Sequence, residues 1–229
     1  MLVLQVAGWL GSARALDPLT LGIGFVLVVA TGACLWLRYW GWLLVSLVFF
    51  GLAAWSSVSS ETLLGQLALP AHATRWCLPF LIWGISAKTL PADKCDAVGR
   101  YAVAATFAAH GLEALLFNPE FVALLEGSSR RLGRGGWSAT TIEQTLSVIG
   151  LLDLAVAAAL VFGPAKFRKG VLLYMCVWGL ITALSRSVAH GFEGMAGTLL
   201  RSANWGIPLA LLMRAAAARP RPDSEEHLG

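Results

Sequence analysis

The chain has 229 residues, of which 57% are hydrophobic and only 13% are Asp, Glu, Lys or Arg, about half the charged share of an ordinary soluble domain. Ten tryptophans and a mean hydropathy of +0.70 exclude a disordered chain and indicate that lipid is the solvent for most of the sequence. The net charge of +4 is not gathered into a basic stripe among aromatic residues, so no nucleic-acid partner is predicted.

The first 18 residues are predicted to lie at the membrane interface. Residues 1–15 contain an apolar stretch and the cleavage-like sequence Ala13-Arg14-Ala15. They lack the basic n-region that a secretory signal requires. We therefore expect an interfacial N-terminal segment over 1–18 rather than a cleaved signal.

The charge pattern defines two clear membrane spans. Residues 19–37 and 39–60 carry no charged side chain and flank Arg38. The later apolar segments are interrupted by ionisable residues, which membrane helices admit where the surroundings are protein rather than lipid. The sequence predicts an all-α, polytopic transmembrane helix bundle of about seven spans, with helices at 19–38, 40–58, 74–89, 97–118, 141–163, 168–188 and 198–214.

The basic residues predict the orientation of the bundle. With the C-terminus inside, ten Lys and Arg residues lie on the inner side and seven on the outer side, in the direction of the positive-inside rule. We expect a bacterial-type cytoplasmic (inner) membrane, with the N-terminus out, the C-terminus in and the lipid bilayer as partner. The Gly- and Arg-rich segment 126–138 is predicted to be a flexible outer loop, and the tail 215–229 to be disordered in the cytoplasm.

An internal repeat is indicated by an offset of 129 residues, which aligns Trp76 with Trp205 and Pro79 with Pro208. The alternative is chance agreement between apolar membrane segments. Because the offset leaves an even number of helices between the copies, the repeat would be parallel rather than inverted. The sequence thus predicts a degenerate parallel duplication, with a three-helix unit at 19–89 and a second copy inside a four-helix unit at 97–214.

A histidine and a glutamate recur three residues apart, in AHGLE at 109–113 and AHGFE at 189–193. On a helix, residues three apart share a face, so His110, Glu113, His190 and Glu193 could together hold a transition metal. Alternatively, each pair could transfer protons, or hold helices together. Convergence of the two pairs requires the glycine-rich segment 191–197 to fold back towards the membrane centre.

Other ionisable groups gather on the same side of the membrane. Asp153 is expected near the midplane, where a carboxylate needs a partner or a proton. The sequence predicts an outward-facing polar cavity with His110, Glu113, Asp153, His190, Glu193 and Glu61 as candidate catalytic residues. Candidate substrate-binding residues are His72, Arg75, Arg186, Arg201, Trp76 and Trp205.

Residues from about 98 to 214 resemble the DoxX/MauE-like membrane proteins. The resemblance rests on His110-Gly111 followed by Asn118-Pro119, on the segment from Leu146 to Asp153, on Val161-Phe-Gly-Pro and on Trp205-Gly-Ile-Pro208. Such proteins often carry Glu where this chain has Asp153. The resemblance implies a four-helix inner-membrane module that acts on or docks a lipophilic, quinone-like redox partner or a small apolar substrate, with another membrane redox subunit as a partner.

Two other interpretations stay open. Acids at the outer ends of two helices, here Glu61 and Glu193, resemble those of the transmembrane terpene cyclases, which would imply general-acid catalysis on an isoprenoid substrate. A non-catalytic membrane scaffold would need only tryptophan-rich helices and small-residue faces for packing. The cofactor is open between a transition metal, a quinone and none.

Overall fold

The computed structural model describes residues 32, 39–133 and 135–217, and in this part the chain is α-helical. The principal helices are α3 (Tyr39–Ser59), α6 (Ala73–Ser86), α7 (Ala92–Leu115), α9 (Ala139–Phe162), α10 (Arg168–His190) and α12 (Ser202–Ala217). Shorter elements connect them: α4 (Leu63–Gln66), α5 (Ala68–Ala71), α8 (Pro119–Arg131), η1 (Ala165–Phe167), η2 (Gly191–Gly194) and α11 (Met195–Leu200). The all-α prediction is confirmed for these residues.

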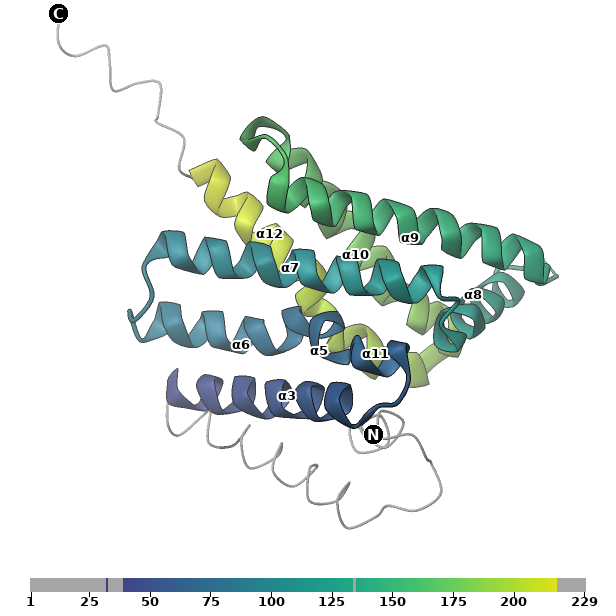
Figure 1. The fold of residues 1–229 in the computed structure, drawn as a ribbon, viewed down its shortest axis with the longest axis horizontal. Helices are drawn as coiled ribbons and strands as arrows, with labels where there is room; N and C mark the ends of the chain where they lie inside the picture. Colours follow the sequence, from purple (N-terminus) through teal and green to yellow (C-terminus); the bar gives the residue numbers. More distant parts are fainter. Residues whose placement is uncertain (1–31, 33–38, 134, 218–229) are drawn as a thin grey trace, which may run out of the picture.

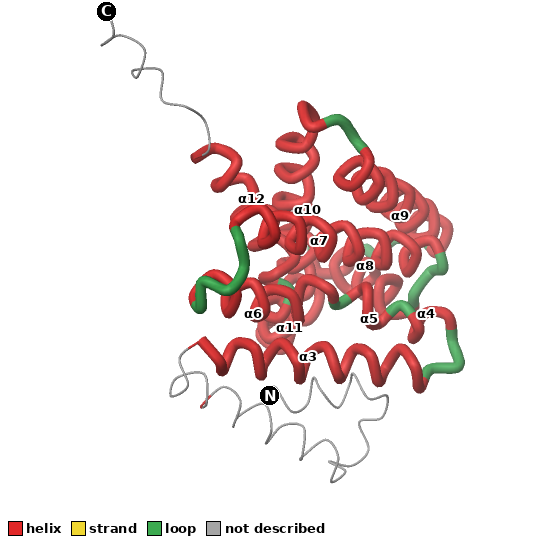
Figure 2. Tube along the Cα trace, turned by 60° about the vertical axis from the view of Figure 1, so that its left-hand side comes forward, coloured by secondary structure: helices red, strands yellow, loops and turns green. Residues whose placement is uncertain are grey.

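The principal helices form a row with a crossing pair packed on it (Figures 1 and 2). Helix α3 packs on α6, α6 on α7, and α7 on α9, while α10 and α12 pack on each other and α12 also contacts α6 and α7. The main hydrophobic core lies where α6, α7, α9, α10 and α12 meet, around Val103, Phe107, Leu160 and Met175. The site described below lies at one end of this bundle.

Close packing of α7 on α9 depends on two glycines. A methyl group on Gly111 would lie 2.8 Å from the carbonyl oxygen of Gly150, and one on Gly150 would lie 2.7 Å from that of Gly111. The two backbones therefore touch without intervening side chains, as is common between membrane helices. This contact fixes the level of His110, which directly precedes Gly111, against the middle of α9.

Three segments are long and apolar enough to cross a membrane: Trp40–Ser59, Ala139–Phe162 and Ala165–Leu200. Helices also occupy the predicted spans 74–89, 97–118 and 198–214, but α6 has 14 residues and α12 has 16, fewer than the ~20 that a straight crossing needs. The predicted segment 1–18 and the first span, 19–38, lie outside the described residues.

The structure corrects three predicted boundaries. Helix α7 begins at Ala92 rather than at 97, and α12 continues to Ala217, so the tail predicted from 215 starts inside a helix. Residues 119–131 form α8 rather than leading directly into a loop. The side chain of Asn118 accepts a hydrogen bond from the backbone of Glu120, and Pro119 occupies the first turn, both favourable at a helix start.

Candidate functional site

The paired histidine and glutamate of α7 form the centre of the site. His110 Nδ1 lies 2.7 Å from Glu113 Oε2, in a hydrogen bond that the carboxylate accepts. Glu113 is only 9% exposed. His110 Nε2 is buried without a hydrogen-bond partner. The prediction that these two residues share a helix face is confirmed, and one ring nitrogen of the histidine remains available for a ligand.

A polar cavity of about 560 Å³ lies beside this pair. Helices α6 and α12 begin there, and α7 and α10 end there. It is lined by seven of the predicted site residues, namely His72, Arg75, His110, Glu113, Arg186, His190 and Arg201. The cavity therefore collects residues that are up to 129 positions apart in the sequence.

The fold-back of residues 191–200 brings His190 to this cavity. Gly191 ends α10 with a φ of 63°, a left-handed conformation that glycine adopts without steric cost. The turn η2 and the short helix α11 follow, and a methyl group on Gly194 would collide with the carbonyl of Arg186. His110 and His190 thus line one cavity, as the predicted fold-back requires.

Three arginines on different elements face the polar cavity. Arg75 lies in α6, Arg186 in α10, and Arg201 follows α11. Their positive charges are near enough to repel one another. Arg75 is 9% exposed, and its Nε and that of Arg186 are buried without hydrogen-bond partners.

The histidine that precedes α6 lies close to these charges. Burial is the main cause that lowers the pKa of His72 well below its ordinary value, and the charge of Arg75 acts in the same direction. His72 is therefore neutral at pH 7.

A second cavity, of about 200 Å³, adjoins the polar one and is mainly apolar. Its walls include Phe107, Leu125, Leu146, Ile149 and Trp178. Asp153 from the middle of α9 lies in the wall, is 5% exposed, and has its Oδ1 buried without a hydrogen-bond partner. His110, Phe121, Arg186 and Arg201 line both cavities, so the two form a two-part site with a polar and an apolar end.

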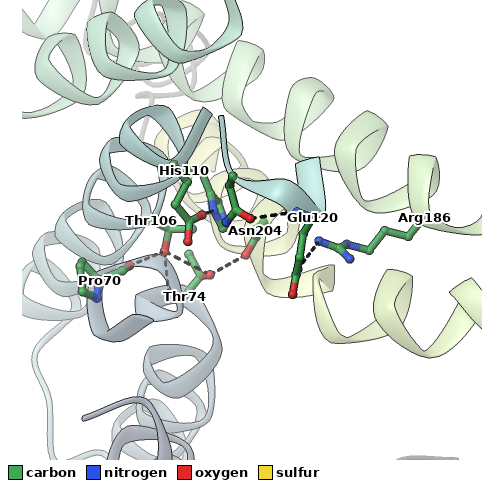
Figure 3. Close-up of polar contacts among 9 residues, drawn as sticks. Pro70, Thr74, Thr106, His110, Glu120, Arg186 and Asn204 are labelled. Atoms are coloured by element: carbon green, nitrogen blue, oxygen red, sulfur yellow. Dashed lines mark hydrogen bonds and ion pairs between the residues drawn. The ribbon is translucent and has the colours of Figure 1, made fainter. Parts of the chain in front are cut away.

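A hydrogen-bond network below the polar cavity joins four elements (Figure 3). Thr74 Oγ1 donates to Asn204 Oδ1 at 2.6 Å, and Thr106 Oγ1 accepts from the backbone N–H of Thr74 at 3.1 Å. Thr106 Oγ1 also lies 3.4 Å from the carbonyl of Pro70. The three polar side chains are at most 4% exposed. The network fixes the starts of α6 and α12, from which Arg75 and Arg201 reach the cavity.

Some predicted residues do not join the site. Glu61 and Glu193 are exposed, and neither lines either of the two cavities. Trp76 and Trp205 are half-buried and also lie outside both cavity walls. Trp76 instead packs against Phe50, with ring centroids 5.3 Å apart.

The predicted metal site is not assembled. Among the residues that the structure describes, which include His110, Glu113, His190 and Glu193, no group of three or more His, Cys, Asp or Glu side chains could hold a metal ion. Glu193 is turned away to an exposed position in η2. The residues present therefore do not fit a metal.

Sequence reasoning missed several residues of the site. Phe121 lines both cavities, Glu120 lies 3.9 Å from Arg186, and Trp178 and Asn204 line the apolar cavity. The sequence Asn118-Pro119-Glu120, with a capping residue, a proline and an acid in the first turn, is a signal for a helix start. Recognising it would have placed Glu120 and Phe121 on a helix next to α7.

Comparisons of the chain with protein families, with curated proteins and with solved structures found no match. The function is therefore inferred from the chemistry of the two cavities.

Proposed function

We propose that this chain is a multi-pass protein of a bacterial-type cytoplasmic membrane that binds a lipophilic ligand, a quinone-like molecule or a small apolar substrate, in an outward-facing two-part cavity. The polar cavity lies at the end of the bundle where α6 begins and α10 ends. The opposite end has short turns with Lys88 and Lys166. The positive-inside rule favours that opposite end as cytoplasmic, with seven spans, the N-terminus out and the C-terminus in.

One observation carries the proposal: His110 lies in the wall of both cavities, bonded through Nδ1 to Glu113 while Nε2 is buried without a partner. With Nδ1–H held by the carboxylate, Nε2 accepts a hydrogen bond in the neutral ring and donates one in the imidazolium. A quinone carbonyl requires a donor and a hydroquinone hydroxyl can use an acceptor. His110 can serve both, with Glu113 stabilising the protonated ring.

Asp153 adds a second polar contact at the apolar end. Its Oδ1 is buried without a hydrogen-bond partner in a wall that is otherwise largely apolar. Binding sites for small apolar molecules typically combine such walls with a few placed polar groups. We infer that Asp153 contacts a polar group of the ligand that lies far from His110.

The DoxX/MauE resemblance supports the same class of ligand and adds a partner. It suggests that another membrane redox subunit exchanges electrons with a quinone held here, since no electron carrier is needed within the chain for docking alone. The four-helix unit 97–214 of that resemblance supplies α7, α9, α10 and α12, and these helices carry His110, Asp153, Arg186 and Arg201.

A matched pair of substitutions on α9 tests the proposal. Ile149 lines the apolar cavity, whereas its neighbour Val148 is 65% exposed on the other side of the helix. The probe is decylubiquinone, titrated calorimetrically against the purified protein in phosphatidylcholine nanodiscs and against empty nanodiscs. We expect saturable binding that Ile149→Trp weakens by about tenfold or more, because overpacking a filled site costs on the order of 1–3 kcal/mol.

Val148→Trp is the control and should leave the affinity unchanged. Equal affinities for the wild type and Ile149→Trp would contradict binding in the apolar cavity, and the scaffold interpretation would then be preferred. His110→Phe keeps the ring but removes both nitrogens, and we expect it to weaken quinone binding without unfolding the protein.

A further inference from the structure

The three arginines of the polar cavity are not neutralised by the acids around them. Arg75, Arg186 and Arg201 contribute three positive charges, and the lining acids are Glu113 and Glu120. Glu113 is already hydrogen-bonded to His110 at 2.7 Å, and the side chain of Glu120 is 69% exposed and lies 3.9 Å from Arg186. In the described part of the chain, Arg75 and Arg201 form no ion pair within 4.0 Å.

Such an arrangement is costly unless an anion completes it. A buried charge without a partner is strongly disfavoured, and Arg75 is only 9% exposed with its Nε unpaired. The charges of Arg75, Arg186 and Arg201 also repel one another. The hydrogen-bond network of Thr74 and Asn204 nevertheless holds the starts of α6 and α12 together. The fold thus keeps the arginines around one cavity in spite of the repulsion.

We propose that the polar cavity binds the phosphate group of an amphipathic phosphate ester, with Arg75, Arg186 and Arg201 around the anion and the apolar chain in the adjoining cavity. This inference rests on the proposed function and specifies the head group of its ligand. Guanidinium groups bind phosphate oxygens through paired hydrogen bonds. Three guanidiniums on separate elements suit a tetrahedral anion with several free oxygens better than a planar carboxylate, which offers two.

The geometry also favours an amphipathic ligand over a free anion. Arg186 and Arg201 line both cavities, and so does Phe121. A phosphate held by the two arginines therefore lies at the mouth of the apolar cavity. An attached alkyl or isoprenoid chain would displace water from apolar walls, which adds affinity that inorganic phosphate lacks.

The experiment separates the head group from the chain. Dodecyl phosphate, dodecanol and inorganic phosphate are each titrated calorimetrically against the purified full-length protein in phosphatidylcholine nanodiscs, with empty nanodiscs as the blank. We expect dodecyl phosphate to bind at least about tenfold more tightly than either of the others, because each lacks one of the two sets of contacts. Added salt should weaken the binding of dodecyl phosphate and leave that of dodecanol unchanged.

Substitutions then locate the anion. Arg201→Gln should weaken the binding of dodecyl phosphate by about tenfold or more and leave the binding of dodecanol unchanged, whereas Arg201→Lys should restore part of the loss because it keeps the charge. Arg130→Gln is the matched control, since Arg130 is exposed on α8 and paired with Glu126 at 3.0 Å. If Arg201→Gln does not fold, Arg186→Gln provides the same comparison.

Three outcomes would overturn the inference. They are equal affinities for dodecyl phosphate and dodecanol, inorganic phosphate binding as tightly as dodecyl phosphate, and an affinity for dodecyl phosphate that Arg201→Gln and Arg186→Gln leave unchanged. If one of these occurs while Ile149→Trp still weakens decylubiquinone binding, the anionic head group is wrong and the proposed function stands. If Ile149→Trp has no effect on either ligand, the proposed function fails as well.

Discussion

The two helical hairpins α3–α6 and α10–α12 share a plan but pack in different ways. In each, a long helix is followed by two short helical segments and then by a helix with proline as its seventh residue, Pro79 in one and Pro208 in the other. The first hairpin packs through aromatic rings, with Phe50 edge-on to Trp76. The second packs backbone against backbone, because Gly179 faces the carbonyl of Asn204. The second hairpin can therefore tolerate less added volume.

The hairpins also differ in the charges that they bring to the site. The offset of 129 residues aligns His72 with Arg201 and Ser57 with Arg186. The first hairpin thus contributes a neutral histidine and a small hydroxyl where the second contributes two arginines. Apolar, tryptophan and proline positions keep the plan of the two hairpins similar, while the ionisable residues at the helix ends make them different.

The largest effect is expected from adding a methyl group to the tight contact. Gly179→Ala would place its Cβ 2.8 Å from the carbonyl oxygen of Asn204, and we expect a loss of about 1–3 kcal/mol in the free energy of unfolding. Denaturation with sodium dodecyl sulfate in mixed micelles measures it. Because the start of α12 would shift, decylubiquinone affinity should fall as well.

Gly51→Ala is the control in the other hairpin. A methyl group on Gly51 would have no heavy atom of another part of the described chain within 4 Å, so the substitution should be neutral or stabilise the helix by about 0.5–1 kcal/mol. Equal destabilisation by the two substitutions would show that the hairpins do not differ in packing as described.

A smaller effect is expected where the two hairpins meet. Thr74→Val removes the hydroxyl that donates to Asn204 Oδ1 at 2.6 Å and keeps the volume of the side chain. It leaves a buried amide oxygen unpaired, and we expect a loss of about 1 kcal/mol in the free energy of unfolding, measured in the same micelles. Ser59→Ala, which removes an exposed hydroxyl bonded to Trp55 at 2.7 Å, should have no measurable effect. A null result for Thr74→Val would mean that this bond does not hold the hairpins together.

The sequence predicted the helices better than it predicted the walls of the site. Apolar segments located six helices, and the spacing of His110 and Glu113 predicted their contact, because helical periodicity is a local property. The arginines were predicted to face outward from their positions at helix ends, and the structure places Arg75, Arg186 and Arg201 at one cavity. These predictions needed only the positions of residues along their own helices.

The remaining features depend on how helices cross, which a single sequence does not encode locally. Glu193 and Glu61 lie at helix ends as expected but point away from both cavities. Trp178 and Asn204 are ordinary members of apolar helices until the α10–α12 contact turns them towards the apolar cavity. The failed metal prediction has the same origin, because it assumed that two like motifs keep like conformations, whereas the second continues into η2.

The smallest expected effect concerns the matched positions His72 and Arg201 at low pH. Burial, Arg75, His110 and Arg201 all lower the pKa of His72 in the folded protein. The unfolded chain therefore binds this proton more readily, so stability is unaffected well above the ordinary pKa of about 6.5 and decreases as the pH falls below it. Thermal unfolding of the wild type should show this decrease between about pH 7 and 5, and His72→Gln should reduce it.

Arg201→Gln should also reduce the acid-induced loss, because it removes one of the positive charges that oppose protonation of His72. The effect on stability is smaller than that of Thr74→Val, since His72 is only half-buried and water screens part of the interaction. If His72→Gln and the wild type lose stability in parallel, the two helix starts are not coupled through charge. The difference between the hairpins would then be confined to the way their helices pack.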